Sequence, residues 1–148
     1  DRLVGLVRRD HPFIGERLTL NQFLQTDQVA MGSPSQSDQI IKRALGRKAQ
    51  QRSIVLEVSH YMALPSILAR SDLLTVIPQS LADEFTRDEL VKTVPMPFKS
   101  EAFKVRQFWH RRMHYDAGHR WIRGVIAELF TTGRTVSTEK PSLTSEQQ

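Results

Sequence analysis

Cysteine is absent from the 148 residues of this chain. Its absence excludes disulfide bonds, thiolate metal sites and a cysteine nucleophile, and it is compatible with a reducing compartment. The chain also lacks an apolar run of the roughly 18 residues that read as a membrane-spanning helix, and its first residues do not form a signal-peptide pattern. We therefore expect a cytoplasmic domain that neither spans a membrane nor carries its own export signal.

The common catalytic signatures are missing as well. The sequence has no glycine-rich phosphate loop, no G-x-S-x-G, no H-E-x-x-H and no acidic metal-binding loop. His110 and His114 are four residues apart, but they flank two arginines without a nearby carboxylate, so we predict no metal site there. No cofactor is indicated, and we expect a binding protein rather than an enzyme.

An excess of basic residues is present. The chain holds 21 Lys and Arg against 16 Asp and Glu, a net charge of +5, and the basic residues gather at 42–52 and 104–123. Such an excess makes nucleic acid a candidate partner, but no helix-turn-helix, zinc-finger or RNA-binding pattern accompanies it. We interpret both clusters as solvated helix ends and turns, where basic side chains are favourable. The length suits one ordinary domain or two small lobes.

The stretch 53–81 organises the chain, because it reads as strand, helix, strand and the start of a second helix. Residues 54–58 are apolar and β-branched without a breaker, which predicts a strand buried on both faces. Apolar residues at helical spacing follow over 62–68, and a second strand is predicted at 73–77. The two strands of such a strand–helix–strand unit are parallel. Parallel sheets bind their ligands at the carboxyl ends of the strands.

Start and stop signals place the flanking elements. Thr19 and Gln22 have the spacing of a capping box, and Ser35 with Asp38 is placed to begin a helix that Gly46 ends. The strand that opens the chain suggests that natural residues precede Asp1. The further predicted elements are strands at 3–7, 29–32, 90–95 and 103–107, a helix from Pro78 to about 85, and a helix capped by Asp116 with an apolar face through residue 130. Strands and helices alternate, so the fold class is α/β.

Candidate binding residues follow two of these strands. Ser33, Ser35 and Ser37 surround the start of a helix, where free N–H groups can bind an anion, although caps and a loop explain the same serines. His60 follows the strand at 54–58 and is a ligand contact, a structural cap or, least expected, a catalytic base. Ser59 is interpreted as an N-cap. If Ser33, Ser35 and His60 meet the same ligand, they do so from neighbouring strand ends.

Six segments of the chain resemble the C-terminal part of LysR-type transcriptional regulators, in particular the branch that answers to small aromatic acids and plant flavonoids. The combination of SDLLTVIPQSLA at 71–82 with FWHRRMHYDAGHRWIR at 108–123 is the specific part of this resemblance. The six segments, in the family's order, are LVRRDHPF at 6–13, LTLNQFL at 18–24, VAMGSPSQSDQIIKRAL at 29–45, VLEVSHYMALPSILARSDLLTVIPQSLA at 55–82, VPMPF at 94–98 and FWHRRMHYDAGHRWIRGVIAELF at 108–130.

The resemblance implies a periplasmic-binding-protein-like (type 2) effector domain, in which two α/β lobes enclose an inducer. It places residues 1–26 in part of the first lobe, 27–95 in the second lobe and 96–130 back in the first, and composition predicts a disordered tail at 131–148. Ser33, Ser35 and His60 fall at cleft positions of the family pattern, and Phe103 lies on the returning strand that approaches the cleft.

The resemblance also implies partners: a small-molecule inducer, and a dimer or tetramer in the parent protein. The winged-helix DNA-binding domain, the linker helix and half of the first lobe do not occur in this chain, so operator DNA is expected to bind only through the missing N-terminal domain. Two alternatives remain open. One is a solute-binding protein of a transport system with the same fold, and the other is a small α/β enzyme that uses His60 as general base.

Overall fold

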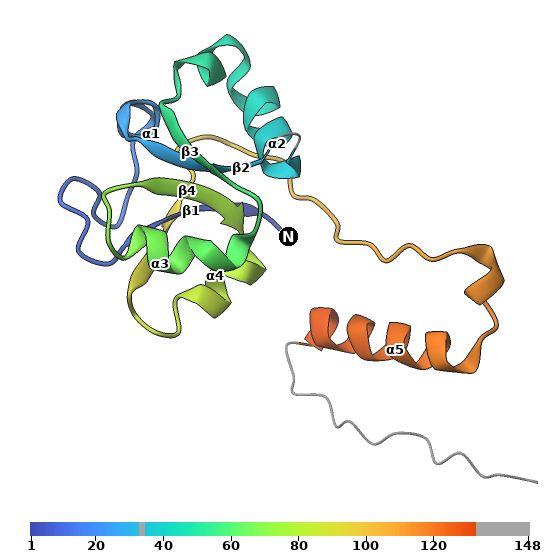
Figure 1. Ribbon diagram of the computed structural model, residues 1–148. Helices are drawn as coiled ribbons and strands as arrows, with labels where there is room; N and C mark the ends of the chain where they lie inside the picture. Colours follow the sequence, from blue (N-terminus) through green and yellow to red (C-terminus); the bar gives the residue numbers. More distant parts are fainter. Residues whose placement is uncertain (33–34, 133–148) are drawn as a thin grey trace, which may run out of the picture. The chain divides into compact units, whose positions relative to one another are not determined.

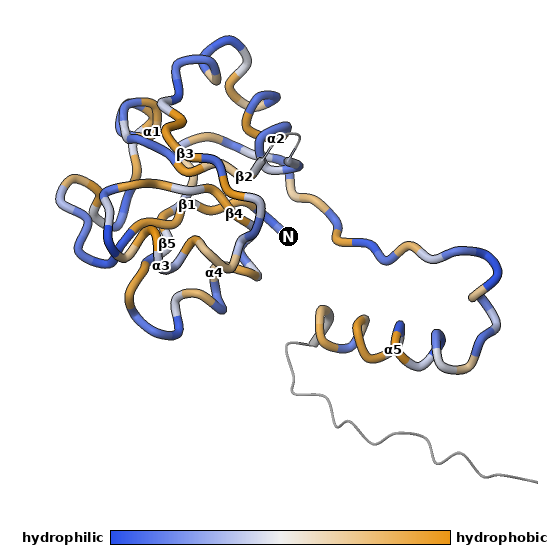
Figure 2. The backbone as a smooth tube through the Cα atoms, in the orientation of Figure 1, coloured by the Kyte–Doolittle hydropathy of each residue, from blue (hydrophilic) through white to orange (hydrophobic). Residues whose placement is uncertain are grey.

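The computed structural model describes residues 1–32 and 35–132 (Figure 1). Ser33 and most of the predicted tail lie outside the described residues. The chain divides into two compact units, Asp1–Lys104 and Val105–Gln148. Within unit 1, Figure 2 shows hydrophobic residues concentrated in the strands, whereas polar residues dominate the turns.

Unit 1 is built on one five-stranded sheet. The strand order is β3-β2-β4-β1-β5. β2 is parallel to both β3 and β4, whereas β1 is antiparallel to both β4 and β5. β1 is therefore the one strand of this sheet that runs opposite to the others. The strands are β1 (Leu3–Arg8), β2 (Gln28–Met31), β3 (Ile54–Val58), β4 (Leu74–Pro78) and β5 (Val91–Pro95).

Helices cover both faces of the sheet (Figure 1). One hydrophobic cluster joins one face to Phe23 and Ile41 of α1 and α2, and a second joins the other face to Leu68 and Phe85 of α3 and α4. Alternate residues of β1 enter the two clusters, Val7 the first and Leu6 the second. The helices are α1 (Leu20–Gln25), α2 (Gln36–Leu45), α3 (Leu64–Leu68) and α4 (Gln79–Phe85), and 3-10 turns span η1 (Gly46–Gln51) and η2 (Tyr61–Ala63).

The helix signals predicted at Thr19, Ser35 and Gly46 are confirmed. The Thr19 hydroxyl accepts from the backbone N–H of Gln22, whose side-chain oxygen accepts from the backbone N–H of Thr19. The Ser35 hydroxyl accepts from the N–H of Asp38 at 3.1 Å, and α2 ends at Gly46 with a φ of 55°. That backbone conformation favours glycine, because a Cβ atom strains it.

Two predictions about β3 and its following turn are wrong. β3 is not buried on both faces: it forms an edge of the sheet, and 55% of Val55 is exposed. The run of apolar residues indicated burial, but an edge position leaves a strand without a neighbour on one side. Ser59 is not the N-cap of the next element either, because His60 holds that position.

Residues on both sides of position 26 belong to one sheet. β1 pairs with β4 and β5, so residues 3–8 share a single sheet with 28–95, and the division into compact units falls after Lys104. No local signal in the sequence indicates that the first strand is inserted antiparallel between two later ones. The strand expected at 103–107 does not form, since this segment has no regular secondary structure. The assignment of residues 1–26 and 96–130 to a first lobe remains a prediction.

Unit 2 contains η3 (Arg111–Met113) and α5 (Ala117–Thr132). Asp116 caps α5 as predicted, since its carboxylate accepts from the N–H of His119 at 2.8 Å. The Trp109 ring stacks on His114, and the guanidinium carbon of Arg123 lies 4.5 Å from the ring centre. Arg123 also donates to two backbone carbonyls at 3.0 and 3.1 Å. Part of the basic cluster at 104–123 therefore stabilises unit 2 itself.

Candidate functional site

All five strands begin or finish at one end of the sheet, as seen along the strand direction. The parallel strands β2, β3 and β4 all finish there, because Met31 lies opposite Val58 and both neighbours of β2 run in its direction. β1 starts at the same edge, where Leu3 lies opposite Pro78, and β5 finishes there, where Val4 lies opposite Pro95. We call this the carboxyl edge. The chain therefore enters and leaves the sheet at the edge where parallel sheets bind their ligands.

Ser35 and His60 follow neighbouring strands at the carboxyl edge. The N–H of Gly32 donates to the carbonyl of Val58 at 2.9 Å, so the pairing of β2 and β3 continues one residue beyond β2. Ser35 is half-buried and uses its oxygen to accept from Asp38, which leaves its hydroxyl hydrogen available to a ligand. His60 is exposed and makes no capping hydrogen bond. His60 is therefore the N-cap of η2 by position, but its side chain does not cap the turn.

Phe103 lies where β1 begins, although it is not on a strand. Its N–H donates to the carbonyl of Asp1 at 2.9 Å, and its partly buried ring packs against the cluster that contains Leu3 and Phe23. Ser33 lies outside the described residues. Of the four predicted ligand contacts, Ser35, His60 and Phe103 thus belong to segments at the carboxyl edge, but none of them lines the cavity found there. A shared ligand remains a prediction.

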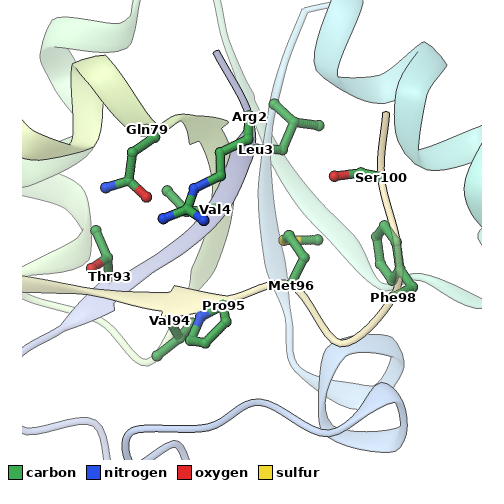
Figure 3. A pocket seen from close by; sticks show the side chains of 10 residues that line it. All are labelled: Arg2, Leu3, Val4, Gln79, Thr93, Val94, Pro95, Met96, Phe98 and Ser100. Atoms are coloured by element: carbon green, nitrogen blue, oxygen red, sulfur yellow. The ribbon is translucent and has the colours of Figure 1, made fainter. Parts of the chain in front are cut away.

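A cavity of about 370 Å³ opens at the carboxyl edge beside β1 and β5. Its volume lies within the roughly 300–1,000 Å³ typical of small-molecule sites. Figure 3 shows Arg2, Gln79 and Thr93 on one side of the cavity and Met96, Phe98 and Ser100 on the other. The lining is completed by Leu3, Val4, Val94 and Pro95. The cavity therefore combines a cationic end with an apolar end.

The polar groups around this cavity are held by the sheet and by α4. The N–H of Gln79 donates to the carbonyl of Arg2 at 2.8 Å, which joins the start of β1 to the start of α4. The Gln79 side-chain amide donates to Asp83 at 2.6 Å, and Ser80 donates to the Asp1 carboxylate through both its N–H and its hydroxyl. Within the described part of the chain, the guanidinium of Arg2 makes no ion pair or hydrogen bond.

A partly buried ionic network fixes α2, and with it Ser35, to the sheet. Asp38 contacts Lys42 at 2.7 Å and Arg52 at 2.9 Å, and Arg52 also donates to the side-chain oxygen of Gln28 at 2.8 Å. Burial acts to raise the pKa of Asp38, but the hydrogen bonds and positive charges of Lys42 and Arg52 outweigh it and hold that pKa below its usual value. Asp38 is therefore a carboxylate at neutral pH, and this network is structural.

A second cavity lies at the opposite edge of the sheet and has a different character. It is lined by Asp27 and Asp72, together with His11 and the exposed ring of Phe13. Asp72 pairs with Arg8 at 2.7 Å, and the imidazole of His11 bonds to the carbonyl of Asp72 at 3.0 Å. Asp27 accepts from the hydroxyl of Ser53 at 2.6 Å. The acidic and imidazole groups of this cavity therefore all take part in contacts that stabilise the fold.

Sequence reasoning missed Arg2, Gln79 and Ser100 as candidate site residues. A signal for Gln79 was present, because it follows the strand predicted at 73–77 and so lies at a carboxyl end, as Ser35 and His60 do. Arg2 carried no such signal, since it precedes a strand. It reaches this edge because β1 is antiparallel to β4.

The described residues contain neither a cluster of metal-ligating side chains nor a membrane-spanning helix. No three His, Asp or Glu side chains among residues 1–32 and 35–132 are grouped so that they could hold a metal ion. His114 accepts from the indole N–H of Trp109 at 3.3 Å, so its Nδ1 atom is engaged. None of the helices in this part of the chain has the length and apolar character needed to cross a bilayer.

The fold and the carboxyl edge define a ligand-binding domain of α/β class. Residues 1–131 match the family described as the LysR substrate binding domain. The chain therefore belongs to this family, which confirms the resemblance seen in the sequence.

Two curated relatives and one solved structure illustrate the relationship. The chain is 33% identical over 128 residues to the HTH-type transcriptional activator NahR of Pseudomonas putida, covering 86% of this chain and 43% of that protein. It is 29% identical to the HTH-type transcriptional activator NagR of a Ralstonia species, covering 88% of this chain and 43% of that protein. The chain thus spans about two fifths of the length of these relatives.

The solved structure is the regulatory domain of MexT, a transcriptional activator in Pseudomonas aeruginosa. It superposes with a TM-score of 0.67 at 21% identity and covers 85% of this chain and 62% of that chain. At this identity the likeness shows the fold, and it confirms the predicted α/β, periplasmic-binding-protein-like class.

Proposed function

We propose that this chain is the effector-sensing part of a cytoplasmic LysR-type transcriptional regulator, and that its effector is a small acid, aromatic in its apolar part. The observation that carries the proposal is the carboxyl edge of a domain in the LysR substrate-binding family. Two strand-to-helix turns, carrying Ser35 and His60, and the segment of Phe103 all belong to this edge. Ser33, beside Ser35 in sequence, completes the proposed set of contacts.

The topology suggests how a bound effector would act on the rest of the protein. β1 enters the sheet at the carboxyl edge, and the chain leaves β5 there on its way to unit 2. A ligand at the carboxyl edge therefore lies beside the entry into β1 and the exit from β5. If the ligand binds one arrangement of these two segments more tightly than another, it shifts the protein toward the arrangement that it binds better. DNA binding and assembly into a dimer or tetramer would belong to the whole regulator, with the operator bound by a domain outside this chain.

The named relatives favour regulation over the alternatives. NahR and NagR are HTH-type transcriptional activators by name, neither a transport protein nor an enzyme. The hypothesis of a His60 general base also lacks an orienting carboxylate, because the His60 imidazole makes no hydrogen bond or ion pair within the described residues. We therefore propose a binding role for His60 and not a catalytic one.

The test is a titration of aromatic carboxylates, monitored by the thermal stability of the chain. Binding to the folded state raises the unfolding temperature with ligand concentration. His60→Ala should reduce this rise, because it removes a hydrogen-bonding group at the carboxyl edge. Ser35→Asp is the sharper variant, since aspartate retains the cap of α2 but repels an anionic ligand. An unchanged response in both variants would exclude these two residues from the effector site.

A further inference from the structure

We infer that the cavity between Arg2, Gln79 and Ser100 is a carboxylate-binding pocket, in which the Arg2 guanidinium binds the carboxylate of a small acid whose apolar body lies against Met96 and Phe98. This inference deepens the proposed function, on which it rests for the class of ligand. It assigns the charged end of that ligand to residues that the strand-to-helix turns do not include.

The argument begins with the charge of Arg2. Its guanidinium is permanently cationic and offers several donors in a planar fork that matches a carboxylate. No carboxylate in the described part of the chain satisfies it: Asp1 accepts from Ser80, and Asp83 accepts from the Gln79 amide. Arg2 thus lines a cavity with a charge that the protein itself does not neutralise.

The second step is the uneven lining of the cavity. Gln79 and Thr93 lie with Arg2 on one side, and Met96 and Phe98 lie on the other, beside Ser100 (Figure 3). The Phe98 ring is fixed edge-on against Phe23, with ring centres 5.4 Å apart, so the apolar wall is part of the hydrophobic core. A ligand with one charged end and one apolar end matches this lining, whereas inorganic anions leave the apolar wall exposed to water.

The third step is the backbone that holds the pocket together. Arg2 is fixed to α4 through the bond from the N–H of Gln79, and β1 is fixed to β5 by the pairing of Val4 with Pro95. The pocket is therefore lined by the segment that enters the sheet, by the segment that leaves it and by the start of α4. A ligand bound in the pocket would therefore act directly on the segment that leads into β1 and on the segment that follows β5.

The test uses benzoate as the probe, with benzamide as a neutral analogue of the same ring and acetate as a carboxylate without the ring. Affinities are measured by calorimetry for the chain and for Arg2→Gln, Arg2→Lys and Arg17→Gln. Arg17 is exposed and does not line the cavity, so it is the matched control for the loss of one positive charge. The backbone amide signals of Gln79 and Ser100 are followed by NMR during the titration.

We expect Arg2→Gln to weaken benzoate binding about tenfold or more, because it removes charge-assisted hydrogen bonds. Arg2→Lys should retain part of the affinity, and Arg17→Gln should retain all of it. Benzamide and acetate should both bind more weakly than benzoate, and the Gln79 and Ser100 signals should shift. Equal unfolding temperatures of Arg2→Gln and Arg17→Gln show that the effect is local.

Two results would overturn the inference. One is an unchanged affinity in Arg2→Gln, and the other is the absence of saturable benzoate binding to the chain. His60→Ala separates this inference from the proposed function. Binding that is lost in His60→Ala but kept in Arg2→Gln refutes the pocket and leaves the proposed effector site standing. Binding that is lost in Arg2→Gln but kept in His60→Ala supports the pocket and removes His60 from the site.

Discussion

The guanidinium of Arg52 lies 2.9 Å from the carboxylate of Asp38, and only 4% of the Arg52 side chain is exposed. Its Nε atom donates to Gln28, and its guanidinium carbon lies 5.7 Å from the centre of the Phe23 ring. One side chain therefore joins α1, β2 and α2. Removing Asp38 would leave the Arg52 charge buried without a carboxylate, and removing Arg52 would leave Asp38 with only the exposed Lys42 as its cation.

We therefore predict that Arg52→Ala lowers the free energy of unfolding by about 3 kcal/mol, the cost of breaking a buried ion pair. Lys42→Ala is the control, because Lys42 pairs with the same carboxylate but its side chain is 65% exposed. Its loss should cost less than about 1 kcal/mol. Urea unfolding followed by circular dichroism measures both values. Equal losses in the two variants would show that burial does not decide the strength of these pairs.

The lowered pKa of Asp38 predicts a specific pH dependence of stability. Because its pKa in the folded protein lies below the usual 3.8, the ionised carboxylate stabilises the fold fully above that value, and this stabilisation is lost as pH falls through the folded pKa. The difference in unfolding free energy between the chain and Asp38→Asn should be constant near neutral pH and should shrink below 3.8. A difference that grows on acidification would have the wrong sign for this mechanism.

Gly5 in the middle of β1 is predicted to tolerate no side chain. A Cβ atom built there would lie 2.8 Å from Cγ2 of Val94 and 3.3 Å from Cδ1 of Leu74, in the core of the sheet. Gly5→Ala should therefore destabilise the chain by about 1–3 kcal/mol through overpacking. Gly15→Ala is the control, because a Cβ atom there meets nothing within 4 Å. Thermal unfolding of the two variants compares them, and similar melting temperatures would contradict the prediction.

The exposed edge strand β3 predicts an effect on solubility. Ile54, Val55 and Leu56 are 41%, 55% and 38% exposed, an arrangement that favours edge-to-edge association. Val55→Lys should raise the solubility limit and change the unfolding free energy by less than about 1 kcal/mol. Val29→Lys on the neighbouring strand is the contrast, since Val29 is 1% exposed and the charge would be buried. Strong destabilisation by Val55→Lys would mean that β3 is covered in solution.

Local signals in the sequence predicted most of the individual elements. The capping box of Thr19 and Gln22, the N-cap Ser35 and the helix stop at Gly46 each depend on residues within one or two turns of each other, so they could be assigned without the fold. The exposure of β3 could not be predicted, because an apolar run has the same appearance in a central strand and at an exposed edge. Register and strand order depend on contacts between distant residues, and a single sequence does not contain them.

The candidate site, too, was predictable from the sequence only in part. Ser35 and His60 were identified because each follows a predicted strand, and the parallel pairing of β2 and β3 assigns both to one edge of the sheet. Arg2 and Ser100 precede a strand and follow one, respectively, in distant parts of the sequence. They line one cavity because β1 is inserted antiparallel between β4 and β5.

The sequence by itself determined the α/β class, the family and the chemistry available at each strand end, because these depend on residue types and short spacings. Only the tertiary structure decided that residues 1–104 form a single unit, that β3 lies at an edge, and that Arg2, which has no ion-pair partner among the described residues, lines a cavity together with Met96 and Phe98. The physical reason is the long-range pairing of β1, which brings the first residues of the chain to the edge where the parallel strands end.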